Sequence, residues 1–153
     1  MNFKTIEQAQ FWERFCIQAK RPLNTMCYEV FYFDDDEETA NDLCARVLSG
    51  KKRASCSAYD YILMEGSAVP KIGDLSLFTD WEGKPKGVIE TTKIEILAFE
   101  AVDQERFERE GEDDTLETWR DGHLRYFKPQ VPSFNMQSLI VFEDFDLIYT
   151  ENE

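Results

Sequence analysis

Two acidic side chains stand where strand alternation turns them towards a protein interior. Alternate positions place Glu90 on the more apolar face of a predicted strand over residues 86–99, and Glu143 on an otherwise apolar face of residues 138–149. Burying an ionised carboxylate is costly unless a partner compensates for it. Two inward acids therefore call for a cation or a functional role. A strand end or a bulge would instead return either carboxylate to solvent, and the sequence leaves both interpretations open.

A basic turn can supply that cation. Residues 49–57 read Ser-Gly-Lys-Lys-Arg-Ala-Ser-Cys-Ser, which predicts a helix ending at Gly50 and a strand beginning a few residues later. As ordinary structure, Gly50 is a C-cap and the basic residues suit the C-terminal end of the helix dipole. This interpretation does not account for Ser55, a small hydroxyl residue three positions after Lys52.

Cysteine and histidine usage excludes several other chemistries. The four cysteines lie 11, 17 and 12 residues apart, and the one histidine is His123. A zinc site needs closely spaced ligand pairs, so we predict no metal site and no cofactor. Free thiols are expected, since disulfides fit poorly with a cytoplasmic chain of this size. A catalytic triad would have to use His123, which lies one helical turn after Trp119 and fits an amphipathic helix packed on the sheet better.

Length, composition and charge limit the class of protein. A chain of 153 residues that is 42% hydrophobic suits one domain with a substantial core. Apolar runs of at most four residues exclude a membrane span, and without a secretory signal the expected location is cytoplasmic. The net charge of −14 opposes binding to duplex DNA. Residues 43–59, however, hold basic but no acidic residues, and such a patch can bind a small anionic or polar ligand.

Helical periodicity and caps predict the elements of the first half. A helix is expected over residues 5–20, begun by a capping box of Thr5 and Gln8, and a strand over 29–33. A second helix begins in the acidic cluster 34–38 and ends at Gly50. Its expected apolar face consists of Ala40, Leu43, Cys44, Val47 and Leu48.

The second half is predicted to be mainly β structure. Strands are expected over residues 55–61, 73–79, 86–99 and 138–149, with a turn at 82–85. A helical insertion spans about 100–128, with one helix capped by Asp103 and a second begun by a capping box of Asp114 and Glu117. This order predicts an α+β fold over 1–153, a small, partly closed β-barrel with flanking N-terminal helices and the insertion.

The basic turn and several later segments together resemble the ASCH domain family, relatives of the PUA fold. Gly50-Lys51-Lys52-Arg53-Ala54-Ser55 resembles the Gly-x-Lys-x-x-Thr/Ser signature of these domains. Further matching segments follow in the same order, at residues 70–75, 79–83, 88–92, 112–120 and 142–145. The resemblance covers about residues 29–150 and indicates a subgroup long described as uncharacterised. It implies a PUA-like β-barrel with a cleft that holds the lysine and a glutamate.

The resemblance also implies a chemistry. Some ASCH proteins are small amidohydrolases that remove the acyl group from cytidine acetylated on its exocyclic nitrogen. The matching positions here would make Lys52 the base, Ser55 the nucleophile and Glu90 the acid or substrate-orienting group. Glu143 would be a supporting carboxylate. A hydroxyl becomes a useful nucleophile when a base takes its proton, and a lysine can do so if burial lowers its pKa. The expected ligand is a nucleoside or modified nucleobase.

Two other functions fit the same sequence. A non-catalytic module could bind single-stranded or structured RNA, as other ASCH proteins have been proposed to do. Lys51 and Arg53 would then meet a phosphate, and Trp81 would stack a base, although a tryptophan beside a turn is more often part of the core. Tyr59 and Tyr61 would line the cleft in either case. Alternatively, a regulatory protein would use the acidic insertion to contact a partner.

Overall fold

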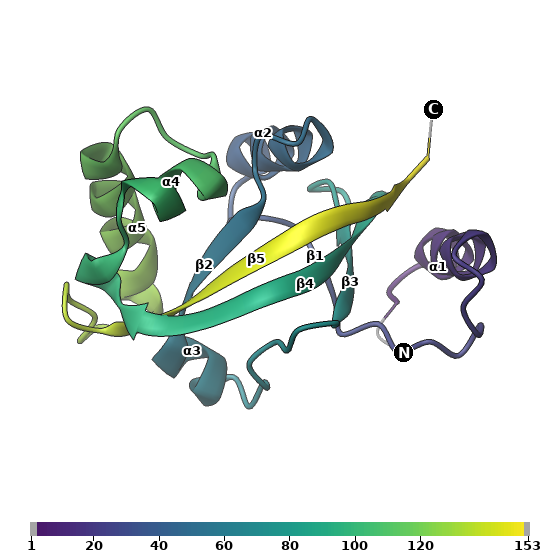
Figure 1. Ribbon diagram of the computed structural model, residues 1–153, viewed down its shortest axis with the longest axis horizontal. Helices are drawn as coiled ribbons and strands as arrows, with labels where there is room; N and C mark the ends of the chain where they lie inside the picture. Colours follow the sequence, from purple (N-terminus) through teal and green to yellow (C-terminus); the bar gives the residue numbers. More distant parts are fainter. Residues whose placement is uncertain (1–2, 152–153) are drawn as a thin grey trace.

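A mixed sheet of five strands, in the order β1-β3-β4-β5-β2, forms the centre of the computed structural model, which describes residues 3–151 (Figure 1). The strands are β1 (Glu29–Phe31), β2 (Ala54–Ala58), β3 (Leu75–Thr79), β4 (Pro85–Ala98) and β5 (Leu139–Thr150). Only β1 and β3 pair in parallel. Register shifts in the long β4–β5 pair increase its twist, so the sheet curls into a half-barrel. The predicted α+β class and partly closed barrel are confirmed.

The first two helices cover opposite faces of this sheet. Helix α1 (Ile6–Gln18), capped by Thr5 as predicted, packs on a cluster that includes Leu77 and Val88. Helix α2 (Glu37–Leu48) packs on a cluster that includes Phe78 and Ile89. Because consecutive strand residues point to opposite faces, these two clusters lie on either side of the sheet. The sheet is therefore buried on both sides where β3 and β4 meet.

Two expectations about element boundaries and one about the apolar face of a helix were wrong. The strand predicted over 55–61 ends at Ala58, and Tyr59–Met64 forms helix α3 instead, which places the two tyrosines on a helix. Leu48 is 40% exposed because it lies one residue, about 100° of helical rotation, past the last buried position of α2. In the insertion, Thr115 rather than Asp114 caps the second helix, since its hydroxyl accepts from the Thr118 amide.

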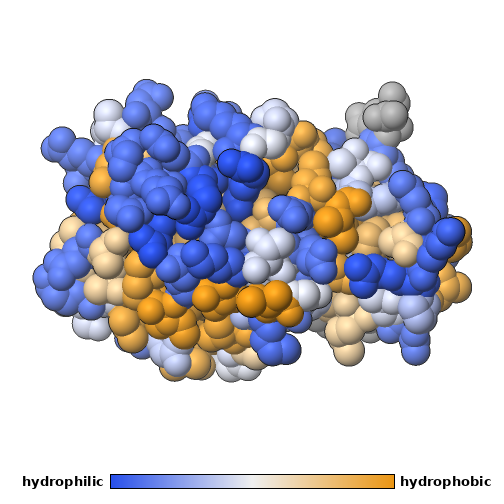
Figure 2. Space-filling model, in the orientation of Figure 1, coloured by the Kyte–Doolittle hydropathy of each residue, from blue (hydrophilic) through white to orange (hydrophobic). Residues whose placement is uncertain are grey.

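The predicted helical insertion is confirmed and forms part of the core. It consists of the 3-10 turn η1 (Phe99–Ala101), helix α4 (Gln104–Glu110) and helix α5 (Leu116–Gln130). Trp119 and Phe127 of α5 are buried against Phe99 and Phe142. Hydrophilic side chains gather on the visible surface over α4 and α5 (Figure 2). This packing fixes the end of α4 against the basic turn that precedes β2. Within residues 3–151, no helix is long and apolar enough to cross a membrane.

Candidate functional site

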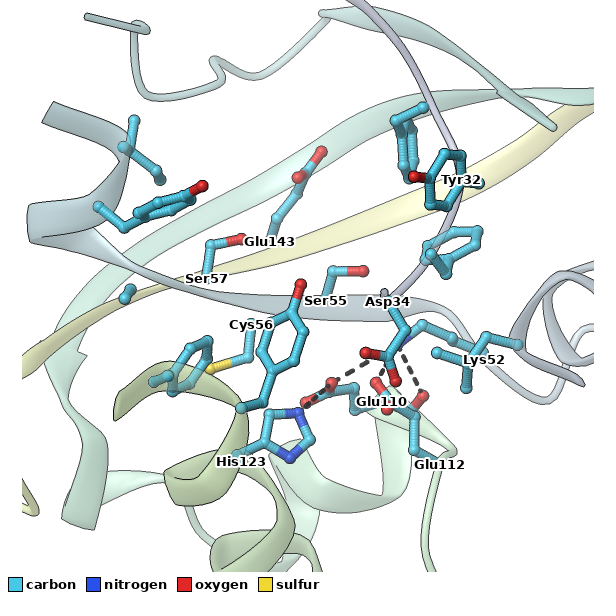
Figure 3. Close-up of a pocket in the computed structure, with 18 of the residues that line it drawn as sticks. Tyr32, Asp34, Lys52, Ser55, Cys56, Ser57, Glu110, Glu112, His123 and Glu143 are labelled. Atoms are coloured by element: carbon cyan, nitrogen blue, oxygen red, sulfur yellow. Dashed lines mark hydrogen bonds and ion pairs between the residues drawn. The ribbon is translucent and has the colours of Figure 1, made fainter. Parts of the chain in front are cut away.

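A pocket of about 570 Å³ lies between the sheet and helices α2, α3 and α5. Ser55 and Ser57 of β2 and Glu143 of β5 line it from the sheet. Glu112, in the loop after α4, and His123 of α5 line it from the insertion (Figure 3). The pocket thus brings the basic turn, the sheet and the insertion together.

The side chain of Lys52 is buried in the wall of this pocket, with 1% of its surface exposed. Its ammonium group donates to the carbonyl oxygen of Ala54 at 2.6 Å, to Glu112 Oε2 at 2.7 Å and to the carbonyl oxygen of Glu110 at 3.3 Å. An ammonium has three protons, so each one is engaged. Lys52 therefore ties the basic turn to the end of α4.

Glycine at position 111 allows this close approach. Gly111 has φ +65°, and a Cβ placed there would overlap the Lys51 carbonyl oxygen and lie 2.8 Å from its carbon. The Arg53 amide also donates to the Arg109 carbonyl across the same junction. A side chain at 111 would push α4 away from the turn and separate Lys52 from Glu110.

Replacing Gly111 by alanine is therefore expected to destabilise the protein by several kcal/mol. Gly66→Ala is the matched control, because Gly66 also has φ +71° but a Cβ there meets nothing within 4 Å. The control isolates the cost of positive φ, about 1–2 kcal/mol. Denaturant unfolding of both variants measures the difference, and equal costs would show that the junction tolerates a methyl group.

Glu110 joins the lysine to the histidine. Its Oε1 lies 3.1 Å from His123 Nε2 and 3.6 Å from Lys52 Nζ, and its Oε2 accepts from Trp119 Nε1 at 2.9 Å. His123 Nδ1 donates to the Trp119 carbonyl at 2.9 Å, and its ring stacks on the Trp119 indole. Both oxygens of this fully buried carboxylate thus have partners.

The cluster separates the pKa values of its two carboxyl groups. Burial and the negative charge of Glu110 raise the pKa of Glu112 to about 8. Burial acts the same way on Glu110, but Lys52 and His123 outweigh it and lower the Glu110 pKa. A pair of carboxyls whose pKa values are pushed apart is suited to proton transfer. At neutral pH Glu112 holds a proton and Glu110 is ionised.

The two basic groups of the cluster keep their charges. Burial alone lowers the pKa of Lys52, but attraction to Glu112 and Glu110 outweighs it and the pKa is raised. For His123, burial is likewise outweighed by Glu110, which raises the pKa to about 9. Lys52 is therefore an ammonium at neutral pH. This argues against the predicted role of Lys52 as a base, which needs a lowered pKa.

The same cluster contains the donor atoms of a metal site. One ligand atom from each of Glu110, Glu112 and His123 lies within 4.8 Å of the others. The Lys52 ammonium, 2.7 Å from Glu112 and 3.6 Å from Glu110, already takes the place of a cation among them. We therefore assign these residues no metal.

On the sheet side of the pocket, a hydroxyl lies beside a carboxylate. Ser55 is paired with Glu143 in the β2–β5 register, so their side chains are neighbours on one face. Thr91 donates to Glu143 Oε2 at 2.6 Å. Burial raises the pKa of Glu143, and the Thr91 hydrogen bond only partly offsets it. Glu143 is thus a stronger base than an exposed carboxylate.

Of the three predicted catalytic residues, Glu90 is the one that does not line the pocket. Ile89 lines the pocket and Thr91 contacts Glu143, so alternation turns Glu90 to the opposite face of β4. The more apolar face of this strand is the one that packs on α1 at Val88. Because both faces of β4 are buried there, apolar character did not identify the face of the pocket.

Four of the predicted ligand-binding residues, Lys51, Arg53, Tyr59 and Trp81, do not line the pocket. Lys51 and Arg53 are exposed and do not line it, and of the two tyrosines on α3 only Tyr61 does. Trp81 also lies outside the lining and packs edge-on against Tyr32, with ring centroids 4.9 Å apart.

Sequence reasoning missed the contribution of Glu110, Glu112 and His123. The available signal was the Glu-Gly-Glu run at 110–112, between the two predicted helices of the insertion, with the one histidine 11 residues beyond it. The sequence instead favours a packing role for His123, and an acidic run alone does not distinguish a buried carboxyl group from a solvated one. His123 does pack on Trp119, but it also lines the pocket.

A mixed sheet curled into a half-barrel, with helices on both faces and a helical insertion before its last strand, defines an ASCH/PUA-like fold. The chain belongs to the ASCH domain family, whose sequence model matches residues 29–149. Both the family and the fold suggested by the turn at 50–55 and the later matching segments are therefore confirmed.

Two solved structures are similar over almost the whole chain. An ASCH domain from Lactobacillus crispatus JV V101 is 30% identical with a TM-score of 0.86, covering 95% of this chain and 97% of that one. Protein EF3133 from Enterococcus faecalis V583, of the family DUF984, is 30% identical with a TM-score of 0.85, covering 93% and 88%. A variant ASCH protein from Zymomonas mobilis, 14% identical with a TM-score of 0.51 over 82% of this chain and 76% of that one, shares the fold. No match was found among curated proteins.

Proposed function

We propose that this ASCH domain binds a nucleoside or modified nucleobase in the pocket and hydrolyses an N-acyl amide on it, as in N-acetylcytidine. One observation carries the proposal. A single pocket, large enough for a nucleoside, is lined by a hydroxyl beside a basic carboxylate and by a carboxyl group that keeps its proton at neutral pH. Amide hydrolysis needs these three groups, namely a nucleophile, a base and an acid.

The surroundings of each residue suggest its role. Ser55 is the nucleophile, and its cross-strand neighbour Glu143 is the base. Glu112 is the acid, in the role that the sequence had given to Glu90. Lys52 is a positioning residue whose ammonium holds the Glu112 carboxyl group at 2.7 Å.

The reaction then follows two steps. The Ser55 hydroxyl attacks the amide carbonyl carbon while Glu143 takes its proton. The carbon–nitrogen bond breaks as Glu112 protonates the leaving exocyclic nitrogen, which leaves the acyl group as an ester on Ser55. Glu143 passes its proton through solvent to Glu112, so that both carboxyl groups return to their starting states. Water then attacks the ester while Glu143 takes one of its protons, and Glu143 gives that proton to Ser55 Oγ as the bond between Oγ and the acyl carbon breaks and the carboxylic acid departs. The sum is amide plus water giving amine plus acid.

Turnover of a substrate panel tests this proposal. N-acylated cytidines and cytosines are incubated with the protein, and release of free cytidine or cytosine is followed by chromatography. Ser55→Ala is expected to lower the rate by about a thousandfold or more, since the nucleophile is lost. Ser57→Ala is the matched control, because it removes the same hydroxyl two residues further along the same face of β2.

Each outcome has a clear meaning. Full activity of Ser55→Ala would place the chemistry at another group. If the folded protein turns over no member of the panel, the pocket is that of a binding module, and titration with single-stranded RNA across salt concentrations becomes the informative experiment.

A further inference from the structure

The charge of the pocket lining points to the kind of ligand it accepts. Besides Glu110 and Glu112, the described lining includes Glu29, Asp34, Asp42, Glu65, Asp113 and Glu143, while its basic residues are Lys52 and His123. The pocket is therefore far more acidic than an anion-binding site.

The two cations of the lining are already engaged. Lys52 is held by Glu112 and by two carbonyl oxygens, and His123 is held by Glu110. A phosphate entering the pocket would have to displace the carboxyl group that already holds each cation. The exposed cations of the preceding turn, Lys51 and Arg53, do not line the pocket.

Two further carboxyl groups of the lining accept hydrogen bonds from neutral donors. Asp34 Oδ1 accepts from the Asp35 amide at 2.8 Å. Glu143 is held by a neutral hydroxyl, that of Thr91. Carboxylates in such positions accept hydrogen bonds from N–H and O–H groups and repel anions.

Aromatic rings supply the apolar part of the lining. Tyr61 of α3 and Tyr126 of α5 contribute rings to the wall, and Phe33 contributes a third. Rings of this kind stack on planar heterocycles. The lining therefore combines surfaces for a planar ring with acceptors for its hydrogen-bond donors.

We propose that the pocket selects its ligand by charge, accepting a free nucleoside or nucleobase and rejecting the same molecule once it carries a phosphate. The identity of the heterocycle rests on the proposed function, whereas the selection against phosphate rests on the lining itself. RNA, whose every nucleotide carries a phosphate, is disfavoured in this pocket for the same reason.

Paired ligands test the proposal directly. Binding of N-acetylcytidine and of its 5′-monophosphate to Ser55→Ala, which prevents turnover, is measured by calorimetry at low and high salt. A 5′-phosphate carries close to two negative charges at neutral pH. We expect the nucleoside to bind about tenfold tighter than the monophosphate, or more, at low salt. The ratio of the two dissociation constants should become smaller at high salt, because the charges are screened.

Charge-neutral variants identify the residues responsible. Asp34→Asn combined with Glu65→Gln should shrink the ratio at low salt, and asparagine tolerates the positive φ of position 34. Asp60→Asn is the matched control, because Asp60 is exposed on α3 and does not line the pocket. This variant should leave the ratio unchanged.

Failure of this inference can be told from failure of the proposed function. Equal or tighter binding of the monophosphate, or a ratio that the double variant does not change, overturns the charge selection even if the wild type hydrolyses the nucleoside. Preferred binding of the nucleoside without hydrolysis by the wild type supports the selection and overturns the reaction. If neither ligand binds, both are overturned.

Discussion

Replacing Lys52 by methionine is expected to cost about 3–5 kcal/mol of unfolding free energy. Methionine preserves the length of the side chain but removes the one charge that faces both Glu112 and Glu110. It also leaves the Ala54 and Glu110 carbonyl oxygens without their donor. A buried carboxylate that loses its partner is among the costliest single changes in a protein.

Denaturant unfolding at several pH values measures this effect. Lys52 and His123 lower the pKa of Glu110 in the folded state. At pH values above the pKa that Glu110 has in the unfolded chain, this pairing therefore adds to the free energy of unfolding. The contribution is lost as the pH falls from there towards the lower pKa of the folded state. The difference in unfolding free energy between wild type and Lys52→Met is therefore largest near neutral pH and becomes smaller in acid. Lys51→Met is the control, since Lys51 is exposed. Equal stability of the two variants would contradict the buried ion cluster.

Replacing Glu112 by glutamine is expected to lower turnover of the N-acyl substrate by about a hundred- to ten-thousandfold. Glutamine keeps the shape of the side chain but has no proton to give to the leaving nitrogen. Asp114→Asn is the control, because it removes an exposed carboxylate two residues further along the same loop. Similar rates in Glu112→Gln and wild type would remove Glu112 from the chemistry.

The pH dependence of the rate gives the same assignment independently. An acid must be protonated, so the wild-type rate should fall as the pH rises through about 8, where Glu112 loses its proton. A base must be ionised, so the rate should also fall in acid, at a pH above the ordinary glutamate pKa, because burial raises the pKa of Glu143. A rate that still increases above pH 9 would contradict the role of Glu112.

Much of the fold was predictable because local signals agreed with tertiary packing. Thr5 and Asp103 cap helices as their sequence context indicated. The long strands carried enough alternation to be found within a residue or two of their true bounds. One exception is residues 59–61, which have the tyrosines typical of a strand but form the start of a helix that borders the pocket.

The site was only partly predictable, for a physical reason. The sequence pattern predicts the basic turn that holds Lys52. It also predicts the two strands that hold Ser55 and Glu143, through their alternation of apolar and polar residues. Glu110 and Glu112 reach the pocket because Gly111 lets the end of α4 approach the Lys51 carbonyl, a contact between segments about 60 residues apart. A contact between such distant segments leaves no periodic pattern in the sequence. The same acidic run on an isolated helix would be solvated.

Detection of the covalent intermediate tests the central claim most directly. The protein is mixed with saturating N-acetylcytidine, quenched in acid after a short interval and analysed by mass spectrometry of the intact chain and of its peptides. We expect the mass of one acyl group on the peptide that contains Ser55, present in Ser57→Ala and absent in Ser55→Ala. Unimpaired turnover by Ser55→Ala, with no acyl group on that peptide in the wild type, would contradict the account.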